Sequence, residues 1–484
     1  MANNRSRLRF ASLAAIGILI GGCATVQKEA ELTKLRGVVS DRTGQQIEWS
    51  AQSYPASKVR EVSAKLTEKE LTAEAAVQLA LLNNRRLQAS LQRLGIAQAD
   101  LVEAGLLENP VLTAGVLFQD AGREIEMDIV QNFIGIFTIS ARSKLGRLEA
   151  ERVSLEVAAD VSELAVRTKE QYYRVVGDTQ ALLLARKILI GAEAAADIAQ
   201  RQYAAGNLSK REQAMQQSFY AEAALEVAQA EVQLSRDREE LNRRIGLWGN
   251  GTYWKVPEQL PPIPQAMPSL ADLESIAVSN RLDLAAAKME LEAIDQNLAL
   301  TRQTRWLGAL GIGVQFKRDA GGEKSYGPKV ELGLPFFDRG QTRVARLESQ
   351  RRAAEDSVTA LAVDIRSEAR ESRDRLIAAR DVARHYEKAL VPIQNTIVSE
   401  TLKFYNGMLL GVYDLLVASR EQVRIGRQYI EANKEFWTAL ADLERAVGRR
   451  VVLEVTSENQ PTDPAGTGQQ APATEGKHHG EHES

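Results

Sequence analysis

The chain has 484 residues, of which 44% are hydrophobic and 5% aromatic, and its formal charge is −3. This near-neutral balance excludes the basic surface on which nucleic-acid-binding proteins depend, so no nucleic acid is expected as a partner. The low aromatic content favours extended helix packing, and the single cysteine excludes an internal disulfide.

Residues 1–22 have the pattern of a removed export signal. A start with three arginines precedes an apolar run, Phe10 to Ile20, that is shorter than the ~20 residues of a membrane-spanning helix. The run ends in Ile-Gly-Gly-Cys, which resembles the bacterial lipobox, where Cys23 would carry the attached lipid. Ala24, rather than aspartate, resembles the sorting pattern of outer-membrane lipoproteins. We expect a lipid-anchored outer-membrane protein with an N-terminal periplasmic segment at 23–65; an ordinary signal peptide with a chance cysteine is the alternative.

The remainder of the chain repeats itself. The paired stretches are GVLF at 115–118 with GVQF at 313–316, RLEAER at 147–152 with RLESQR at 346–351, and LNRRIG, ending at Gly246, with LERAVG, ending at Gly448. Four such matches in one order, including the turns near 206 and 407, indicate a duplication. We expect repeats at 66–256 and 269–450, joined by a stiff Pro-rich linker at 257–268.

Each repeat is predicted to contain a helix, two strands, a long helix, a glycine turn and a returning helix. The first repeat has helix 72–105, strands at about 110–119 and 124–134, helix 141–203, a turn near 206 and helix 209–245. The second has helix 270–304, strands at about 306–318 and 325–336, helix 341–404, a turn near 407 and helix 412–447. The long helices have a nearly heptad apolar spacing, which predicts coiled-coil packing. Gly206 and Gly407 are expected at the turns in left-handed conformation.

The four strands alternate apolar with polar residues. Ile125, Met127 and Ile129 share one face of the second strand, whereas Glu124, Glu126 and Asp128 share the other. Segments of roughly ten residues with this alternation match strands of a transmembrane β-barrel, and the smallest barrels have eight strands. The missing strands must then come from other subunits. A soluble sheet packed on helices, with its apolar face hidden, is the alternative.

This duplicated plan resembles the outer-membrane efflux protein family, the TolC-like channels, over roughly 66–450. The motifs that carry the resemblance are LALLNN at 79–84, NPVL at 109–112, VELGLPFFDRGQTRVA at 330–345 and GVYDLLVASREQV at 411–423. The implied fold class is mainly α with a transmembrane β-barrel part. A homotrimer would form a twelve-stranded barrel in outer-membrane lipid and a long periplasmic α-barrel. Glu124, Glu126 and Asp128 would then line the lumen.

The resemblance also implies partners at the far end of the helices, namely a periplasmic adaptor (membrane fusion protein) and an inner-membrane efflux pump. The tips that dock the adaptor would be the turns at Gly206, Asn207, Gly407 and Met408. Asp414 matches the first aspartate of the family's tip motif, so three copies would form a pore gate. Val417 stands in place of the second aspartate. An ordinary aspartate near a helix N-terminus is the alternative for Asp414.

The tail at 451–484 is rich in Pro, Gly, Gln and Thr and is expected to be disordered. Three histidines gather there, His478, His479 and His482, and imidazole suits copper, nickel and zinc. The cluster suggests a metal-binding tail and heavy-metal efflux, with copper as a candidate.

No G-x-S-x-G, H-E-x-x-H or P-loop motif occurs in the chain, so neither an enzyme nor a cofactor is expected. Three alternatives to an efflux channel stay open: the outer-membrane component of a type I protein secretion system, a periplasmic coiled-coil structural lipoprotein, and a lipoprotein enzyme with an unrecognised site.

Overall fold

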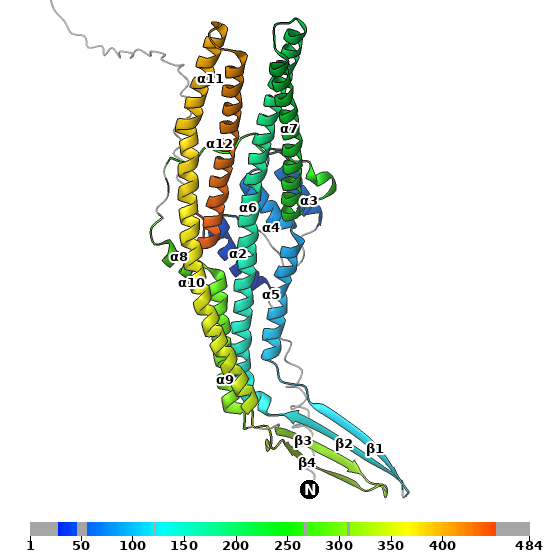
Figure 1. Cartoon of the computed structure of the whole chain (residues 1–484). Helices are drawn as coiled ribbons and strands as arrows, with labels where there is room; N and C mark the ends of the chain where they lie inside the picture. The colour runs from blue at the N-terminus through cyan, green and yellow to red at the C-terminus, as the bar shows by residue number, and fades with distance from the viewer. Residues whose placement is uncertain are drawn as a thin grey trace, which may run out of the picture.

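The computed structural model describes residues 28–45, 56–120, 122–265, 267, 270–306 and 310–451. The export signal, Cys23 and the tail histidines lie outside these residues. The described part is elongated, with a four-stranded sheet at one end and long helices that run away from it (Figure 1). No helix within the described ranges combines the length and the apolar character that crossing a membrane requires.

The first repeat starts with a helix that is broken in two. α4 (Ala73–Asn83) and α5 (Arg85–Ala104) meet at Asn84, so the single helix expected over 72–105 is wrong at this point. The Asn84 side chain accepts hydrogen bonds of 2.9 and 3.1 Å from the backbone N–H groups of Arg86 and Leu87, and this N-cap starts a new helix. After the strands come α6 (Ile134–Ala204), the returning helix α7 (Lys210–Ile245) and a short 3-10 turn (Gly249–Thr252).

The second repeat follows the same plan. α8 (Leu273–Asn280) and α9 (Leu282–Thr304) break at Arg281, where one helix was expected over 270–304. α10 (Gln341–His385) passes through a π-helical turn (Tyr386–Leu390) into α11 (Val391–Asn406), and α12 (Val412–Val447) returns. Pro392 accounts for the π turn, because its ring cannot follow a regular α-helical turn.

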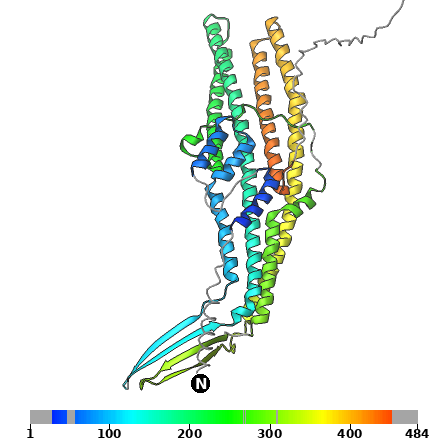
Figure 2. The ribbon, with the colours of Figure 1, turned by 180° about the vertical axis from the view of Figure 1, so that it is seen from behind.

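Two helices that the sequence analysis did not predict lie in the N-terminal segment, α2 (Lys28–Thr43) and α3 (Ala56–Glu68). Leu35 and Val39 of α2 are buried against apolar residues of α5 and α6. Arg42 Nη1 donates hydrogen bonds of 2.6 Å to the carbonyl oxygens of Asn280 and Gly448. Seen from behind, α2 (dark blue) lies across the long helices, so it ties the two repeats together (Figure 2).

The four strands form one antiparallel sheet in the order β1-β2-β3-β4. They are β1 (Val111–Gln119), β2 (Gly122–Asn132), β3 (Leu310–Arg318) and β4 (Lys324–Leu332). β2 pairs with β3, so the sheet joins the two repeats. β4 ends at Leu332, before the expected residue 336, because Gly333 and Pro335 follow it. β2 ends at Asn132, whose side chain accepts a 3.1 Å hydrogen bond from Ile134 N at the start of α6.

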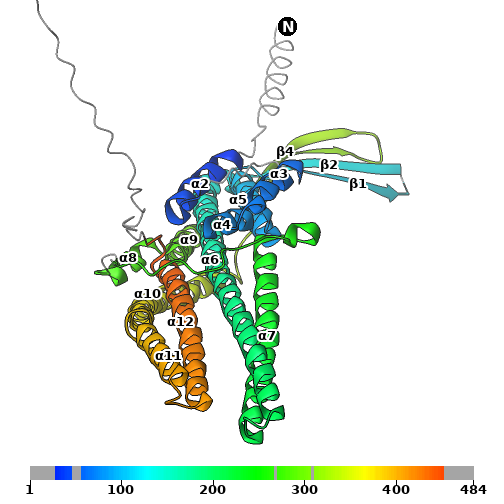
Figure 3. The same ribbon diagram turned by 90° about the horizontal axis from the view of Figure 1, so that it is seen from above.

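The main apolar core lies where the long helices converge near their middle. It contains Tyr173 and Val176 of α6, Leu241 of α7 and Phe436 and Leu440 of α12. Seen from above, α6 pairs with α7 and α11 pairs with α12 (Figure 3). The described part of the linker is not helical and passes along this core, where its Pro261 carbonyl oxygen accepts a 2.9 Å hydrogen bond from Trp437 Nε1.

Both returning helices end against the break in the first helix of their own repeat. α7 ends at Gly246 (φ +69°), and a Cβ there would come within 2.7 Å of the Asn83 carbonyl oxygen. α12 ends at Gly448 (φ +71°), where a Cβ would come within 3.3 Å of the Asn280 carbonyl oxygen. The duplication is therefore visible in matching contacts as well as in the order of elements.

Replacing Gly246 with alanine should destabilise this junction by about 1–3 kcal/mol, because the new Cβ collides with Asn83 and a positive φ disfavours a side chain. Gly191→Ala in α6 is the matched control, since a Cβ there meets nothing within 4 Å and alanine suits a helix interior. Thermal unfolding followed by circular dichroism compares the two variants. Equal midpoints for both would contradict the close approach assigned to Gly246.

Candidate functional site

The polar face of the sheet brings charged residues of both repeats together. Glu124, Glu126 and Asp128 lie side by side on one face of β2, as predicted. Lys329 Nζ of β4 lies 2.9 Å from Asp128 Oδ2, and Lys317 of β3 forms an ion pair with Glu124. Two of the three predicted lumen carboxylates therefore have a lysine partner from the second repeat.

The paired carboxylates are also the buried ones. Asp128 is 5% exposed and Glu124 is 9% exposed, and a carboxylate with so little water needs a cationic or hydrogen-bonding partner. Glu126 accepts a hydrogen bond from Gln315 Nε2. Glu331 of β4 lies on the same face, so four carboxylates share it with two lysines and the face keeps a negative excess.

The opposite face of the sheet is apolar and uncovered. Val116 is 52% exposed, Ile129 47% and Val330 67%, and the cross-strand register places all three on this face. The alternative of a soluble sheet required a helix over these residues, and within the described part of the chain none covers them (Figure 1). An uncovered apolar face of this kind fits contact with lipid.

The two helix hairpins end in turns of different geometry. Gly206 has φ +79°, as the sequence predicts. The expectation for Gly407 is wrong, because its φ is −78° and the left-handed residue is Met408, with φ +56°. The helix before the second turn extends to Asn406, so Gly407 takes the C-cap position with a negative φ and the left-handed conformation falls on the next residue. Met408 is 94% exposed, which leaves its side chain free at the tip.

Asp414 lies exposed in the first turn of α12, just past the second tip. Its Oδ2 accepts a 3.2 Å hydrogen bond from the backbone N–H of Gly411, so the carboxylate caps the helix. Tyr413 and Val417 are 45% and 49% exposed beside it. The local geometry accounts for Asp414 as a cap, and its role as a gate stays a prediction.

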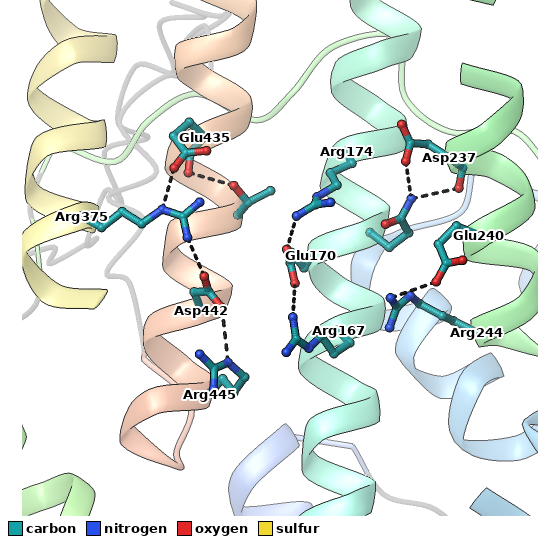
Figure 4. Close-up of polar contacts among 12 residues, drawn as sticks. Arg167, Glu170, Arg174, Asp237, Glu240, Arg244, Arg375, Glu435, Asp442 and Arg445 are labelled. Atoms are coloured by element: carbon teal, nitrogen blue, oxygen red, sulfur yellow. Dashed lines mark hydrogen bonds and ion pairs between the residues drawn. The ribbon is translucent and has the colours of Figure 1, made fainter. Parts of the chain in front are cut away.

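Ion pairs connect the long helices midway along the molecule (Figure 4). Arg375 of α10 lies 2.7 Å from both Glu435 and Asp442 of α12. On the neighbouring α6, Glu170 pairs with Arg174 and, at 3.6 Å, with Arg167. The Glu170 pairs lie within α6, so of the pairs named here only those of Arg375 join two helices, and exposed pairs of this kind contribute little each.

One carboxyl group of this region is buried between the repeats. Asp178 of α6 is 6% exposed, and Lys434 Nζ of α12 lies 3.1 Å from its Oδ1. Its Oδ2 is buried without a hydrogen-bond partner. Burial raises the pKa of Asp178 to about 7, and the adjacent Asp237 carboxyl contributes to the rise. Lys434 reaches the site because Gly177 leaves room, since a Cβ there would come within 2.7 Å of Lys434 Cδ.

Sequence reasoning missed the lysine partners of the lumen carboxylates and the buried Asp178. The alternation placed Lys317 and Lys329 on the polar face, but their partners lie about two hundred positions away in the chain, and only the strand register shows the pairing. Asp178 carries no sequence signal of its own beyond the small Gly177 that precedes it. Among the described residues, no group of three or more His, Cys, Asp or Glu could hold a metal ion.

No protein-family model matches the chain. The cobalt-zinc-cadmium resistance protein CzcC of Cupriavidus metallidurans is 24% identical over 387 residues, which cover 78% of this chain and 90% of CzcC. The CmeC outer membrane channel of Campylobacter jejuni superposes with a TM-score of 0.68 at 14% identity, covering 85% of this chain and 90% of CmeC. CusC, solved in a study of transmembrane channel formation, gives a TM-score of 0.65 at 14% identity, covering 84% and 96%. These likenesses confirm the predicted fold class.

The variant Asp178→Asn should make the stability of the helical part less dependent on pH. The folded-state pKa of Asp178, about 7, lies above the ordinary value of 3.8. Between these values the folded form binds more protons than the unfolded form, so stability falls as the pH rises through this window. The asparagine side chain does not titrate in this range. The midpoint temperature of unfolding should therefore drop less between about pH 4 and pH 8 in the variant than in the wild type.

Circular dichroism at several pH values measures this, with the exposed Glu193→Gln in the same helix as control. If Asp178→Asn followed the wild-type pH profile, the titration assigned to Asp178 would be refuted.

Proposed function

We propose that this member of the outer-membrane efflux protein family is the outer-membrane channel of a tripartite efflux system. It would conduct substrates that an inner-membrane pump and a periplasmic adaptor deliver to it. The observation that carries the proposal is the sheet, which is uncovered and apolar on one face, charged on the other, and open at both edges. The likeness to CzcC and CmeC supports the same conclusion.

The open edges argue for a trimer. β1 and β4 each lack a neighbour on one side in a single protomer. In lipid, every backbone N–H and C=O must be paired, so β4 of one protomer would pair with β1 of the next until the sheet closes. Four strands are too few for a barrel with a polar interior, whereas three protomers supply twelve. Closure with the apolar face outward directs Glu124, Glu126 and Asp128 into the lumen.

Heavy-metal ions are the proposed substrate class. CzcC is named for resistance to cobalt, zinc and cadmium. The histidines at 478, 479 and 482 extend the hypothesis to copper, because imidazole binds this ion well. An outlet for protein secretion would use a similar channel, but the relationship to a metal-resistance protein favours efflux of ions.

Deleting the gene should lower the tolerance of the host cell to one or more of cobalt, zinc, cadmium and copper, and the full chain should restore it. A chain ending at residue 469 tests the tail separately. Growth over graded metal concentrations measures both effects. Unchanged tolerance in the deletion strain for all four metals would contradict the metal role, while full rescue by the shortened chain would remove only the tail from the mechanism.

The exposed hairpin tips are the proposed docking points for the adaptor. Asn207→Glu or Met408→Glu should abolish rescue in the same assay without lowering the amount of protein in the outer membrane, because a buried charge weakens a docked interface. Met408→Gly is the control, since glycine accepts the left-handed backbone and adds no charge. Rescue by both glutamate variants would exclude the tips as docking points.

Three copies of Asp414 would form a ring of carboxylates where the helices converge, which attracts multivalent cations. Asp414→Asn should reduce the block of channel current by a trivalent cation added on the periplasmic side by about tenfold in blocking concentration. Asparagine keeps an oxygen to accept the hydrogen bond from Gly411, so the helix cap survives while the charge is lost. Asp120→Asn, at the opposite end of the molecule, is the control. Single-channel recordings in which Asp414→Asn is blocked as strongly as wild type would refute the gate.

A further inference from the structure

Three cationic side chains lie on the apolar face of the sheet at the end far from the helices. Arg318 of β3 is directly opposite Lys324 of β4, and on its other side it is opposite Ile125 of β2. Arg123 lies two residues from Ile125 on the same face, which makes it a diagonal neighbour of Arg318 at roughly 7–8 Å. The three residues therefore form one row across three strands.

The two hairpins that carry these residues are in contact. A Cβ on Gly122 would come within 2.8 Å of the Ala320 carbonyl oxygen, so the turn between β1 and β2 packs against the turn between β3 and β4. The guanidinium of Arg123 rests 5.6 Å from the centre of the Phe118 ring. This contact orients Arg123 along the apolar face.

None of the three cations has a carboxylate within ion-pair distance among the described residues, and all three are exposed. The contrast with the other face is sharp, because Lys317 and Lys329 each have an acidic partner there. Like charges directly opposite each other on paired strands repel. Asp319 and Glu323 flank Arg318 and Lys324 in the turn without pairing with them, so the exposed row is available to an anion from outside the protomer.

The position of the row indicates which anions are available. If the apolar face lies in the outer membrane, as the proposed function requires, then nine strand residues from Lys324 to Leu332 cover about 30 Å. A tilted strand of this length spans the apolar band of a barrel, so its ends reach the two headgroup regions. The helices extend toward the periplasm, and the row therefore lies at the headgroups of the outer leaflet. Phe118 and Tyr326 beside it are typical of such an interface.

We propose that Arg123, Arg318 and Lys324 form a binding site for the phosphate groups of an anionic lipid in the outer leaflet. Guanidinium groups bind phosphate oxygens through two parallel hydrogen bonds, and the lysine adds a third positive charge. The acyl chains of the same lipid lie along the exposed apolar residues of the strands, such as Val314 and Val330. The inference rests on the proposed function, because it needs the sheet to be in the outer membrane.

The test uses the full-length protein purified in detergent and native mass spectrometry of bound lipid. The probes are bisphosphorylated lipid A, the same lipid after removal of both phosphates, and inorganic phosphate as a competitor. Wild type should retain the phosphorylated lipid about tenfold better than the dephosphorylated one. The triple variant Arg123→Gln, Arg318→Gln, Lys324→Gln should lose this preference.

A matched triple variant on the periplasmic helices, Arg211→Gln, Arg346→Gln, Lys388→Gln, removes the same charge from exposed positions and should behave as wild type. Equal retention by wild type and the sheet variant would overturn the proposal, and so would displacement of the lipid by inorganic phosphate alone, which would indicate a simple anion site. Single-channel conductance is measured on the same samples. Conducting pores without lipid preference defeat the lipid site and leave the channel intact, whereas absence of pores defeats the proposed function.

Discussion

The pairing of β2 with β3 is the contact on which the rest of the molecule depends. Between β2 and β3 the chain runs along α6, returns along α7, crosses through the linker and continues through α8 and α9. The two strands can pair only if these elements bring the chain back to the end of the molecule where β2 lies. Its register sets Met127 opposite Phe316 and Asp128 opposite Gln315. A slip of one residue would exchange the two faces of one strand. The apolar face and the charged face therefore both exist because of this register.

The contacts at the middle of the helices fix where β2 and β3 lie relative to each other. Gly246 and Gly448 end the two returning helices against the breaks that follow Asn83 and Asn280. From these breaks, α5 and α9 run to the sheet over 20 and 23 residues, or about 30 and 35 Å. Because α5 and α9 are of similar length, the β1–β2 hairpin and the β3–β4 hairpin lie side by side at the same end of the molecule. Arg42 adds a third connection, from the N-terminal segment to the end of the second repeat.

Charged side chains are paired differently on the three surfaces of the molecule, according to how exposed each surface is. On the polar face of the sheet, Asp128 and Glu124 are buried and have lysine partners, because an isolated buried carboxylate is costly. On the helices, Arg375 of α10 forms exposed pairs with Glu435 and Asp442 of α12, and single pairs of this kind contribute little. On the rim of the apolar face, Arg318 and Lys324 face each other without acids.

The sequence by itself determined the duplication, the order of the strands and long helices within each repeat, and the two faces of the sheet. Repeated motifs, long proline-poor runs and the alternation of apolar with polar residues are local patterns, so they can be recognised without knowing which residues are in contact. Motifs that follow one another in order along the chain also resemble those of the outer-membrane efflux protein family.

Tertiary structure alone decided the features that depend on distant neighbours. The breaks at Asn84 and Arg281 lie against the ends of the returning helices, and this contact between distant segments is visible only in the fold. The left-handed residue of the second tip is Met408 instead of Gly407 because the helix runs further than the turn signal indicates. The pairing of Asp128 with Lys329, and the burial that raises the pKa of Asp178, join residues of different repeats. No local pattern encodes such pairs, since the free energy of each depends on what the fold places beside it.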